Sequence, residues 1–168
     1  MFTRNGYVRA GFVALGLMLA ASAANAQSKF GIGKAASDTE IKAWDIDVSP
    51  NGVGLPAGSG SVAQGGKLYA EKCAACHGAK GEGKPADRLV GGQGTLKAAN
   101  PVKTIGSFWP YATTVFDYVY RAMPYTAPQS LSASETYALT AYLLHMNGIL
   151  GAEATLDAAS LAKIRMPN

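Results

Sequence analysis

Hydrophobic residues recur at helical spacing in two stretches in the middle of the chain, and each stretch predicts a helix. The first begins at Ser61, a residue type that caps helix N-termini, and runs to about Ala75. The second covers Thr113–Ala122 and ends at the pair Met123-Pro124, because proline disfavours helical geometry in the residue before it.

A third predicted helix has clear signals at both ends. It opens with the capping-box pattern Ser132-x-x-Glu135, and the pair Asn147-Gly148 ends it. The tail that follows predicts a short helix near residues 156–164. Because the chain shows no internal repeat and no strand-rich stretch, the sequence predicts an all-α fold.

The part of the chain before the first helix has a different composition. Residues 27–60 are rich in Gly, Ser and Pro, which indicates an extended arm with limited regular structure. Trp44 in this arm either packs on the domain's own surface or docks on a partner. We therefore expect a signal peptide over 1–26, the extended arm over 27–60, a main domain over 61–150 and a C-terminal tail over 151–168.

The first residues have the organisation of a secretory signal. Arg4 and Arg9 precede the apolar run Ala10–Ala24, and a small-x-small cleavage pattern ends at Ala26. We expect export, cleavage after Ala26 and no stable membrane insertion afterwards. The alternative is an uncleaved membrane anchor, although the run is shorter than the roughly 20 residues that span a bilayer.

Composition narrows the class of protein further. The chain has 168 residues, the length of one ordinary domain, and cleavage would remove Arg4 and Arg9 and lower its formal net charge from +4 to +2. It contains no Lys/Arg-rich run, so nucleic-acid binding is not predicted. Its two cysteines are too few for a disulfide-rich scaffold, a four-cysteine zinc site or an all-cysteine iron–sulfur cluster.

Those two cysteines lie in the sequence Cys73-x-x-Cys76-His77, which is the covalent attachment pattern of haem c. Two thiols about one helical turn apart reach the two vinyl groups of one haem, and His77 then lies under the iron as the proximal ligand. Attachment of haem c requires export, which the N-terminal segment independently predicts. The sequence therefore predicts one covalent haem c.

Three other interpretations of the motif fit less well. A thioredoxin-like C-x-x-C follows a strand and opens a helix, whereas this motif closes a predicted helix. A zinc site needs more ligands, and outside the motif only His145 remains. A structural disulfide across two intervening residues is strained.

The sixth ligand of the iron has four candidates: Met123, Met146, Met166 and His145. Met123 is preferred, because it starts a loop at a helix end and Met/His is the usual ligand pair of cytochromes c. Met146 lies on the last helix, where a core role is expected, and Met166 in the tail is a rival. His145 would give bis-His ligation, although a surface position is expected for it, and an open iron site is the last alternative.

Groups around the haem can also be anticipated. The second ring nitrogen of a ligating histidine donates to a carbonyl, a carboxylate or water, and the carbonyl of Pro85 or a near neighbour is the candidate for His77. Trp109, Tyr111 and Arg121 are candidates to bond the haem propionates, the alternative being packing or solvation. The two propionates add about −2 at neutral pH, which leaves the mature haem-loaded protein near neutral.

With its motif, Met-Pro loop and final capped helix, the sequence resembles class I c-type cytochromes. The resemblance implies a small helical cytochrome c fold over residues 61–150, in which the first and last helices cross. It places the crossing at Gly65, Gly66 and Tyr69 on the first helix and at Leu139, Tyr142 and Leu143 on the last.

A more specific resemblance covers most of the chain after residue 26. It is to the cytochrome subunits of periplasmic sulfite dehydrogenases and of the sulfur dehydrogenase of the sulfur-oxidation (Sox) system, whose partner subunit carries a molybdenum cofactor. The strings that carry it include Phe30–Gly33, Trp44–Val48, Gly91–Leu96, Tyr111–Thr114, Arg121–Pro124 and Ala127–Leu131. The Sox cytochrome commonly has a second C-x-x-C-H, whereas this chain has one, which favours a monohaem subunit or carrier.

The resemblance implies a periplasmic electron-transfer protein without catalytic residues of its own. Single electrons would come from a molybdenum-containing sulfite or sulfur dehydrogenase subunit and pass to a downstream cytochrome or oxidase. One alternative is a freely diffusing carrier to a terminal oxidase. Another is a haem enzyme or ligand sensor with an open iron site.

Overall fold

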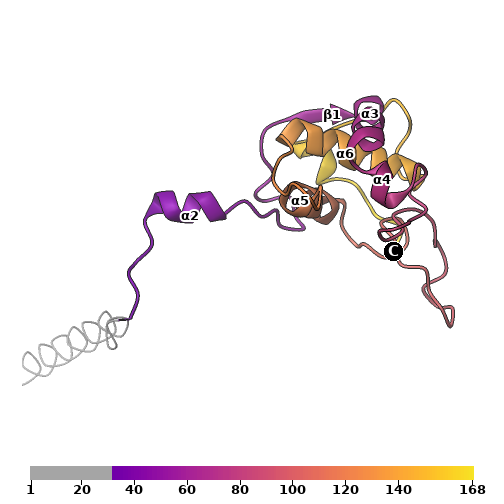
Figure 1. Cartoon of the computed structure of the whole chain (residues 1–168), viewed down its shortest axis with the longest axis horizontal. Helices are drawn as coiled ribbons and strands as arrows, with labels where there is room; N and C mark the ends of the chain where they lie inside the picture. Colours follow the sequence, from indigo (N-terminus) through magenta and orange to yellow (C-terminus); the bar gives the residue numbers. More distant parts are fainter. Residues whose placement is uncertain (1–31) are drawn as a thin grey trace, which may run out of the picture. The chain divides into compact units, whose positions relative to one another are not determined.

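The computed structural model describes residues 32–168, so the predicted signal peptide and the first residues of the predicted arm lie outside the described part. The chain divides between Ala43 and Trp44 into two units, which we describe separately. Figure 1 shows the elements in chain order. Within residues 32–168, no helix has the length and apolar character needed to cross a membrane.

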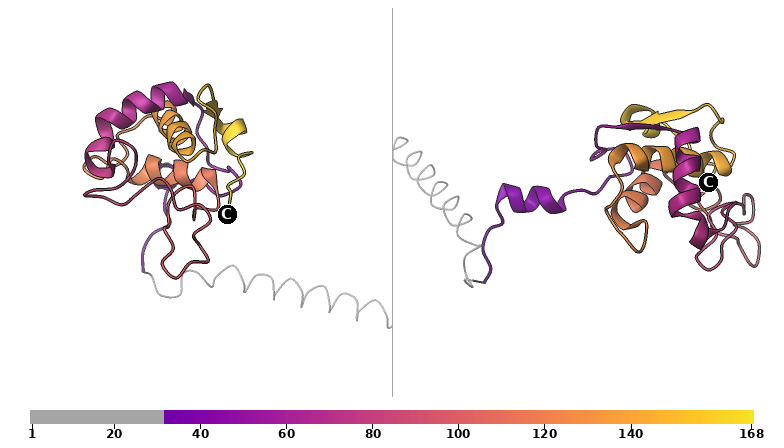
Figure 2. Two further views of the ribbon diagram at one scale, coloured as in Figure 1. Left: turned by 90° about the vertical axis from the view of Figure 1, so that its right-hand side faces the viewer. Right: turned by 45° about the horizontal axis from the view of Figure 1, so that its top comes forward.

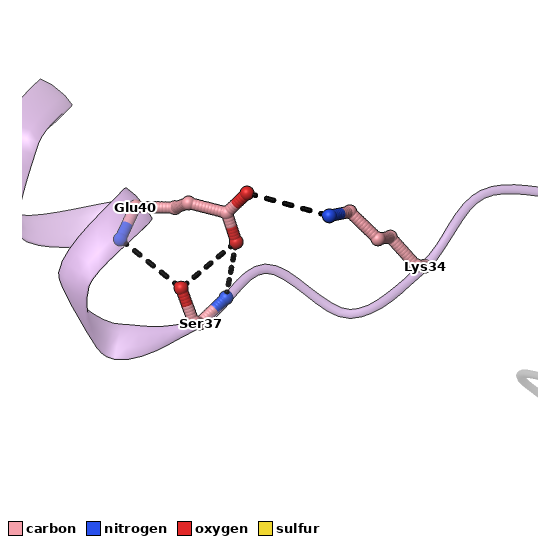
Figure 3. A network of polar contacts seen from close by, with 3 residues as sticks. All are labelled: Lys34, Ser37 and Glu40. Carbon is pink, nitrogen blue, oxygen red and sulfur yellow. Dashed lines mark hydrogen bonds and ion pairs between the residues drawn. The ribbon is translucent and has the colours of Figure 1, made fainter.

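The described part of the arm contains a short helix, α2 (Asp38–Trp44), where the sequence led us to expect limited regular structure. Ser37 and Glu40 form a reciprocal cap: the Glu40 carboxylate accepts the Ser37 N–H at 2.8 Å, and the Ser37 hydroxyl accepts the Glu40 N–H at 3.3 Å. Lys34 lies 3.5 Å from the same carboxylate (Figure 3). None of the residues of α2 is buried, and Trp44 is 86% exposed.

In the second unit, the three predicted helices are confirmed. They are α3 (Val62–Lys72), α5 (Ala112–Ala122) and α6 (Ala133–Met146). Ser61 caps α3 in a reciprocal box with Gln64, and Ser132 caps α6 in the same way with Glu135. Each box satisfies backbone N–H groups that the first helical turn leaves unpaired.

The predicted crossing of the first and last helices is also present (Figure 1). Gly65 of α3 packs directly on the backbone of Ala138 in α6, where a Cβ atom would overlap the carbonyl group. One turn further along, the rings of Tyr69 and Tyr142 pack with centroids 5.3 Å apart. A glycine at the contact therefore lets the two backbones approach, and the two aromatic rings fill the space beside it.

A short antiparallel ribbon joins the two ends of this unit (Figure 2). β1 (Ser59–Ser61) pairs with β2 (Thr155–Asp157), with Gly60 opposite Leu156. The last helix, α7 (Ala158–Leu161), follows β2 directly.

One compact unit runs over Trp44–Asn168 and includes residues of both the predicted arm and the predicted tail. Leu156 and Leu161 of the predicted tail are fully buried, and Val48 of the predicted arm is 6% exposed. Strands of three residues have no detectable period and pair over a long separation in sequence, so neither composition nor spacing predicts them. The fold is helical as predicted, with this ribbon added.

The core lies between α5, α6 and the ribbon. Its largest fully buried side chains include Phe116 and Tyr137, whose ring centroids are 4.5 Å apart. The Tyr137 hydroxyl donates to the carbonyl of Pro56 at 2.9 Å, which satisfies its polar end in the core. The predicted arm after residue 44 thus contributes both apolar and polar partners to the core.

Candidate haem site

The attachment motif lies at a break between two helices. α3 ends before Cys73, and α4 (Ala74–His77) forms a single turn after it. The carbonyl of Cys73 accepts the N–H groups of Cys76 and His77 at 3.1 and 3.0 Å. This turn sets the spacing of the two sulfur atoms, with Cys73 half-buried and Cys76 exposed.

The imidazole of His77 is oriented by the loop that follows it. Its Nδ1 donates to the backbone carbonyl of Asp87 at 2.7 Å, two residues beyond Pro85, the centre of the expected neighbourhood. Because a carbonyl can only accept, the proton lies on Nδ1, and Nε2 keeps the lone pair that binds a metal. The loop is held in turn by two backbone bonds, from Gly83 to the His77 carbonyl at 2.8 Å and from Ala86 to the Cys76 carbonyl at 2.9 Å.

A cavity of about 700 Å³ opens beside the motif. All four predicted haem-binding residues, Cys73, Cys76, His77 and Met123, line it, although they come from two parts of the chain. Its volume is in the range of cofactor sites, which are mostly apolar with a few polar groups. The apolar part of the wall is formed by Leu89, Ile105, Trp109, Val115, Val119, Leu131, Leu139 and Leu143.

Met123 reaches the cavity because of its position on α5. It follows Val115 and Val119 at intervals of four residues, so the three side chains share one face of the helix and its end, and all three line the cavity. The Met123 N–H donates to the Val119 carbonyl at 3.1 Å and closes the last helical turn. Imidazole and thioether donors in one apolar cavity suit haem iron.

Among the described residues, the other three ligand candidates do not line this cavity. Met146 and Met166 pack against the hydrophobic core, and His145 Nδ1 donates to the Leu150 carbonyl at 3.0 Å. His145 thus closes the end of α6. Within residues 32–168, no group of three or more His, Cys, Asp or Glu side chains is placed to hold a metal ion, so the donor set suits a haem better than zinc.

The state of the Cys73 thiol argues against a redox-active thiolate. Burial raises the pKa of Cys73 to about 11, so the group is protonated at neutral pH. Reactive C-x-x-C motifs have a lowered thiol pKa at a helix N-terminus. Here α3 precedes the motif, as the sequence predicted, and only the single turn of α4 follows Cys73.

Of the three candidates for the propionates, only Trp109 lines the cavity among the described residues, and its ring meets Tyr118 edge to face at 5.6 Å. Arg121 instead donates two hydrogen bonds to Asp117: Nε to Oδ1 at 2.8 Å and Nη2 to Oδ2 at 2.6 Å. Tyr111 is half-exposed outside the lining.

The cavity wall also contains three cationic side chains that the sequence did not indicate as part of the site: Lys72, Arg88 and Lys103. Lys72 directly precedes the motif, so its proximity could have been read from the chain. Arg88 and Lys103 come from the long loop between α4 and α5, where no periodicity gives their direction.

The comparisons with known proteins identify the family of the chain. The model of the cytochrome c family matches residues 62–147, which span the motif, α5 and α6. The chain belongs to the cytochrome c family, whose members bind haem c, and it is an electron-transfer cytochrome by that membership. Among curated proteins, none matches the chain.

A similar solved structure shows which members of the cytochrome c family this chain resembles. The chain is similar to a chain of the sulfane dehydrogenase SoxCD from Paracoccus pantotrophus, with 48% sequence identity and a TM-score of 0.77. The match covers 83% of this chain and 70% of that one. The resemblance to the cytochromes of sulfur-compound dehydrogenases, expected from the sequence, is thereby confirmed.

Proposed function

We propose that this protein is a periplasmic monohaem cytochrome that accepts single electrons from a molybdenum-containing sulfite or sulfur dehydrogenase subunit and passes them to a downstream cytochrome or oxidase. The observation that carries the proposal is the single cavity lined by Cys73, Cys76, His77 and Met123. The chain has one C-x-x-C-H motif and no further cysteine, which supports one covalent haem.

Each of the four residues has a separate role in this proposal. Cys73 and Cys76 form the two thioether bonds, His77 binds the iron through Nε2, and Met123 binds it through its sulfur. The haem supplies reversible one-electron chemistry when bound. The protein fixes the axial ligands and surrounds them with an apolar wall, and both the thioether ligand and the low polarity favour a high reduction potential.

The identity of the electron donor rests on similarity. The related solved structure is named a sulfane dehydrogenase. The single motif of this chain fits a monohaem acceptor of the sulfite dehydrogenase kind, and the basic, apolar and small-x-small parts of residues 1–26 support export with cleavage after Ala26. In this proposal the substrate chemistry belongs to the partner subunit.

The test is to mix the purified, oxidised cytochrome with sulfite, with and without a candidate molybdenum subunit, and to follow haem reduction by absorbance. We expect rapid reduction only when enzyme and sulfite are both present. Thiosulfate in place of sulfite distinguishes the two substrate classes. Slow reduction in every mixture would remove the dehydrogenase assignment and leave the membership in the cytochrome c family intact.

A diffusing carrier to a terminal oxidase is separated from a dedicated subunit by co-purification. A tagged cytochrome isolated from its native cells should bring a molybdenum protein with it, identified by its metal content. Isolation of the cytochrome alone, at a salt concentration that preserves weak complexes, would favour the carrier.

A further inference from the structure

The helix that delivers Met123 makes contacts on two opposite sides. Val115, Val119 and Met123 face the cavity, whereas Thr113 and Asp117 make hydrogen bonds elsewhere. Asp117 and Val119 are two residues apart, about 200° around the helix axis. The face of α5 that carries Asp117 is thus directed away from the cavity.

That second face is bound by residues 46–50, which we call the strap. The Thr113 hydroxyl donates to the Pro50 carbonyl at 2.8 Å, and the N–H of Val48 donates to Asp117 Oδ1 at 2.8 Å. Val48 itself is 6% exposed and belongs to the core. The strap therefore attaches to α5 at two points, one helical turn apart.

Asp117 is the central group of this attachment. Its residue is 8% exposed, and its carboxylate accepts one bond from the strap and two from Arg121 on the next turn. Burial alone would raise its pKa, but the Arg121 side chain and the Val48 amide together hold the pKa of Asp117 below its ordinary value. The group is a fully bonded carboxylate, and a charge-assisted bond is roughly twice as strong as a neutral one.

This arrangement restrains the two movements that would displace Met123. Rotation of α5 about its axis would swing Asp117 away from the strap, and sliding along the axis would separate Thr113 from Pro50. Either movement would disturb both contacts, because they lie on the same face one turn apart. The strap thereby fixes the end of the cavity that holds Met123, from the side of α5 that faces away from the cavity.

We propose that Asp117 is a positioning residue for Met123: by holding the strap, it sets the rotation of α5 and keeps the methionine sulfur at the haem. The inference rests on the proposed ligation of haem iron by Met123. It assigns to residues 46–50, which belong to the predicted arm, a role in ligand geometry.

The experiment compares three variants of the haem-loaded protein. Asp117→Ala removes the acceptor for both partners, and Asp117→Asn keeps an oxygen for the Val48 N–H but removes the ion pair with Arg121. Tyr137→Phe is the matched control, because it removes the hydrogen bond from α6 to Pro56 and leaves α5 and its ring contact with Phe116 in place.

The readout is the rate at which added imidazole displaces the sixth ligand from ferric iron, together with the methionine-to-iron charge-transfer band. We expect Asp117→Ala to raise the displacement rate about tenfold or more, the size expected for loss of charge-assisted bonds. Asp117→Asn should give a smaller increase, and Tyr137→Phe should stay within about twofold of the wild type. If the displacement rate depended on the stability of the fold alone, an Asp117 variant and Tyr137→Phe of equal stability would show equal rates.

The outcomes separate this inference from the proposed function. If the wild type lacks the charge-transfer band and Met123→Ala leaves its spectrum unchanged, the proposed ligation fails. If the band is present and the two Asp117 variants displace methionine no faster than Tyr137→Phe at matched stability, the positioning role is overturned. Should Asp117→Ala fail to accumulate with haem, Asp117→Asn and Thr113→Val carry the test, and wild-type rates in both would overturn the inference.

Discussion

His77 and Asp87 are joined by a hydrogen bond of 2.7 Å, from the imidazole Nδ1 to the backbone carbonyl. The bond leaves Nε2 as the nitrogen available to a metal and fixes the plane of the ring. It also makes the proximal ligand depend on the position of a loop that has no regular secondary structure. Whatever anchors that loop contributes to the haem site.

In addition to its two backbone bonds to the motif, the loop is anchored by Asn147, the C-cap of α6. It is 7% exposed, and its side-chain nitrogen donates to the carbonyls of Leu89 at 3.1 Å and Leu143 at 2.9 Å. We predict that Asn147→Ala lowers the free energy of unfolding by about 2 kcal/mol or more, because two carbonyl groups lose their donor. Denaturant unfolding of the haem-loaded protein, followed by circular dichroism, measures the change.

Gln93→Ala is the control for this prediction. Gln93 is exposed, and within residues 32–168 its side chain bonds only the backbone carbonyl of Asn147, at 3.2 Å. Its loss should cost about 0.5 kcal/mol or less. Equal losses in the two variants would mean that Asn147 does not anchor the loop.

Replacement of Met123 should change the haem spectrum, whereas replacement of Met166 should not. Met123→Ala is expected to abolish the charge-transfer band of the oxidised protein and to lower the reduction potential, because a thioether ligand stabilises ferrous haem. Met166 packs against the core outside the cavity, so Met166→Ala should keep both properties. Spectroelectrochemical titration measures the two quantities, and the opposite pattern would assign the sixth ligand to the tail.

The helix crossing predicts a contrast between two neighbouring glycines. A Cβ atom at Gly65 would overlap the Ala138 carbonyl, whereas one at Gly66 would lie 3.2 Å from the ring of Tyr142. We predict that Gly65→Ala destabilises the protein by about 3 kcal/mol or more through overpacking. Gly66→Ala should be close to neutral, because the gain in helix propensity of about 1 kcal/mol offsets the tighter ring contact. Thermal unfolding measures both, and similar values would contradict the backbone contact.

Part of the stability should be lost in acid through the cap of α6. Hydrogen bonds from the Ser132 backbone and hydroxyl lower the pKa of Glu135 below its ordinary value of 4.5. A lowered carboxyl pKa stabilises the fold above pH 4.5, and this contribution disappears as the pH falls through the folded-state value. We predict that Glu135→Gln costs about 0.5 kcal/mol at neutral pH and less as the pH falls below 4.5.

Unfolding curves of both proteins between neutral and acid pH check this dependence. Glu153→Gln serves as the control, since the Glu153 carboxylate has no hydrogen bond or ion pair within the described residues. A pH-independent difference between the wild type and Glu135→Gln would show that the charge of Glu135 contributes nothing.

Deletions at two different points should separate partner binding from haem geometry. None of residues 32–44 lines the haem cavity, and Trp44 is 86% exposed, so removal of residues 27–44 after cleavage should keep the haem spectrum and weaken binding to the dehydrogenase subunit. Removal of 27–60 also takes away Val48 and β1 and should disturb the spectrum. Titration calorimetry and absorbance measure the two effects. Unchanged affinity after the shorter deletion would remove the docking role.

Features that depend on neighbours in the chain could be read from the sequence. The motif around His77 needs only its own spacing, and the caps at Ser61 and Ser132 act within three residues. The periodicity of α5 also predicted that Met123 follows its last turn. Local geometry determined these elements, which is why the haem motif and the helices were predicted with nearly correct bounds.

The tertiary structure decided which distant residues meet. In the folded chain, His77 bonds the Asp87 carbonyl, and Asp117 bonds both Arg121 and the strap. The strands β1 and β2, which are far apart in sequence, pair with each other. These contacts depend on how loops without periodicity pack on a common core, and chain spacing carries no signal for that. The sequence alone therefore predicted a haem-binding chain, while long-range packing determined how its ligands are held.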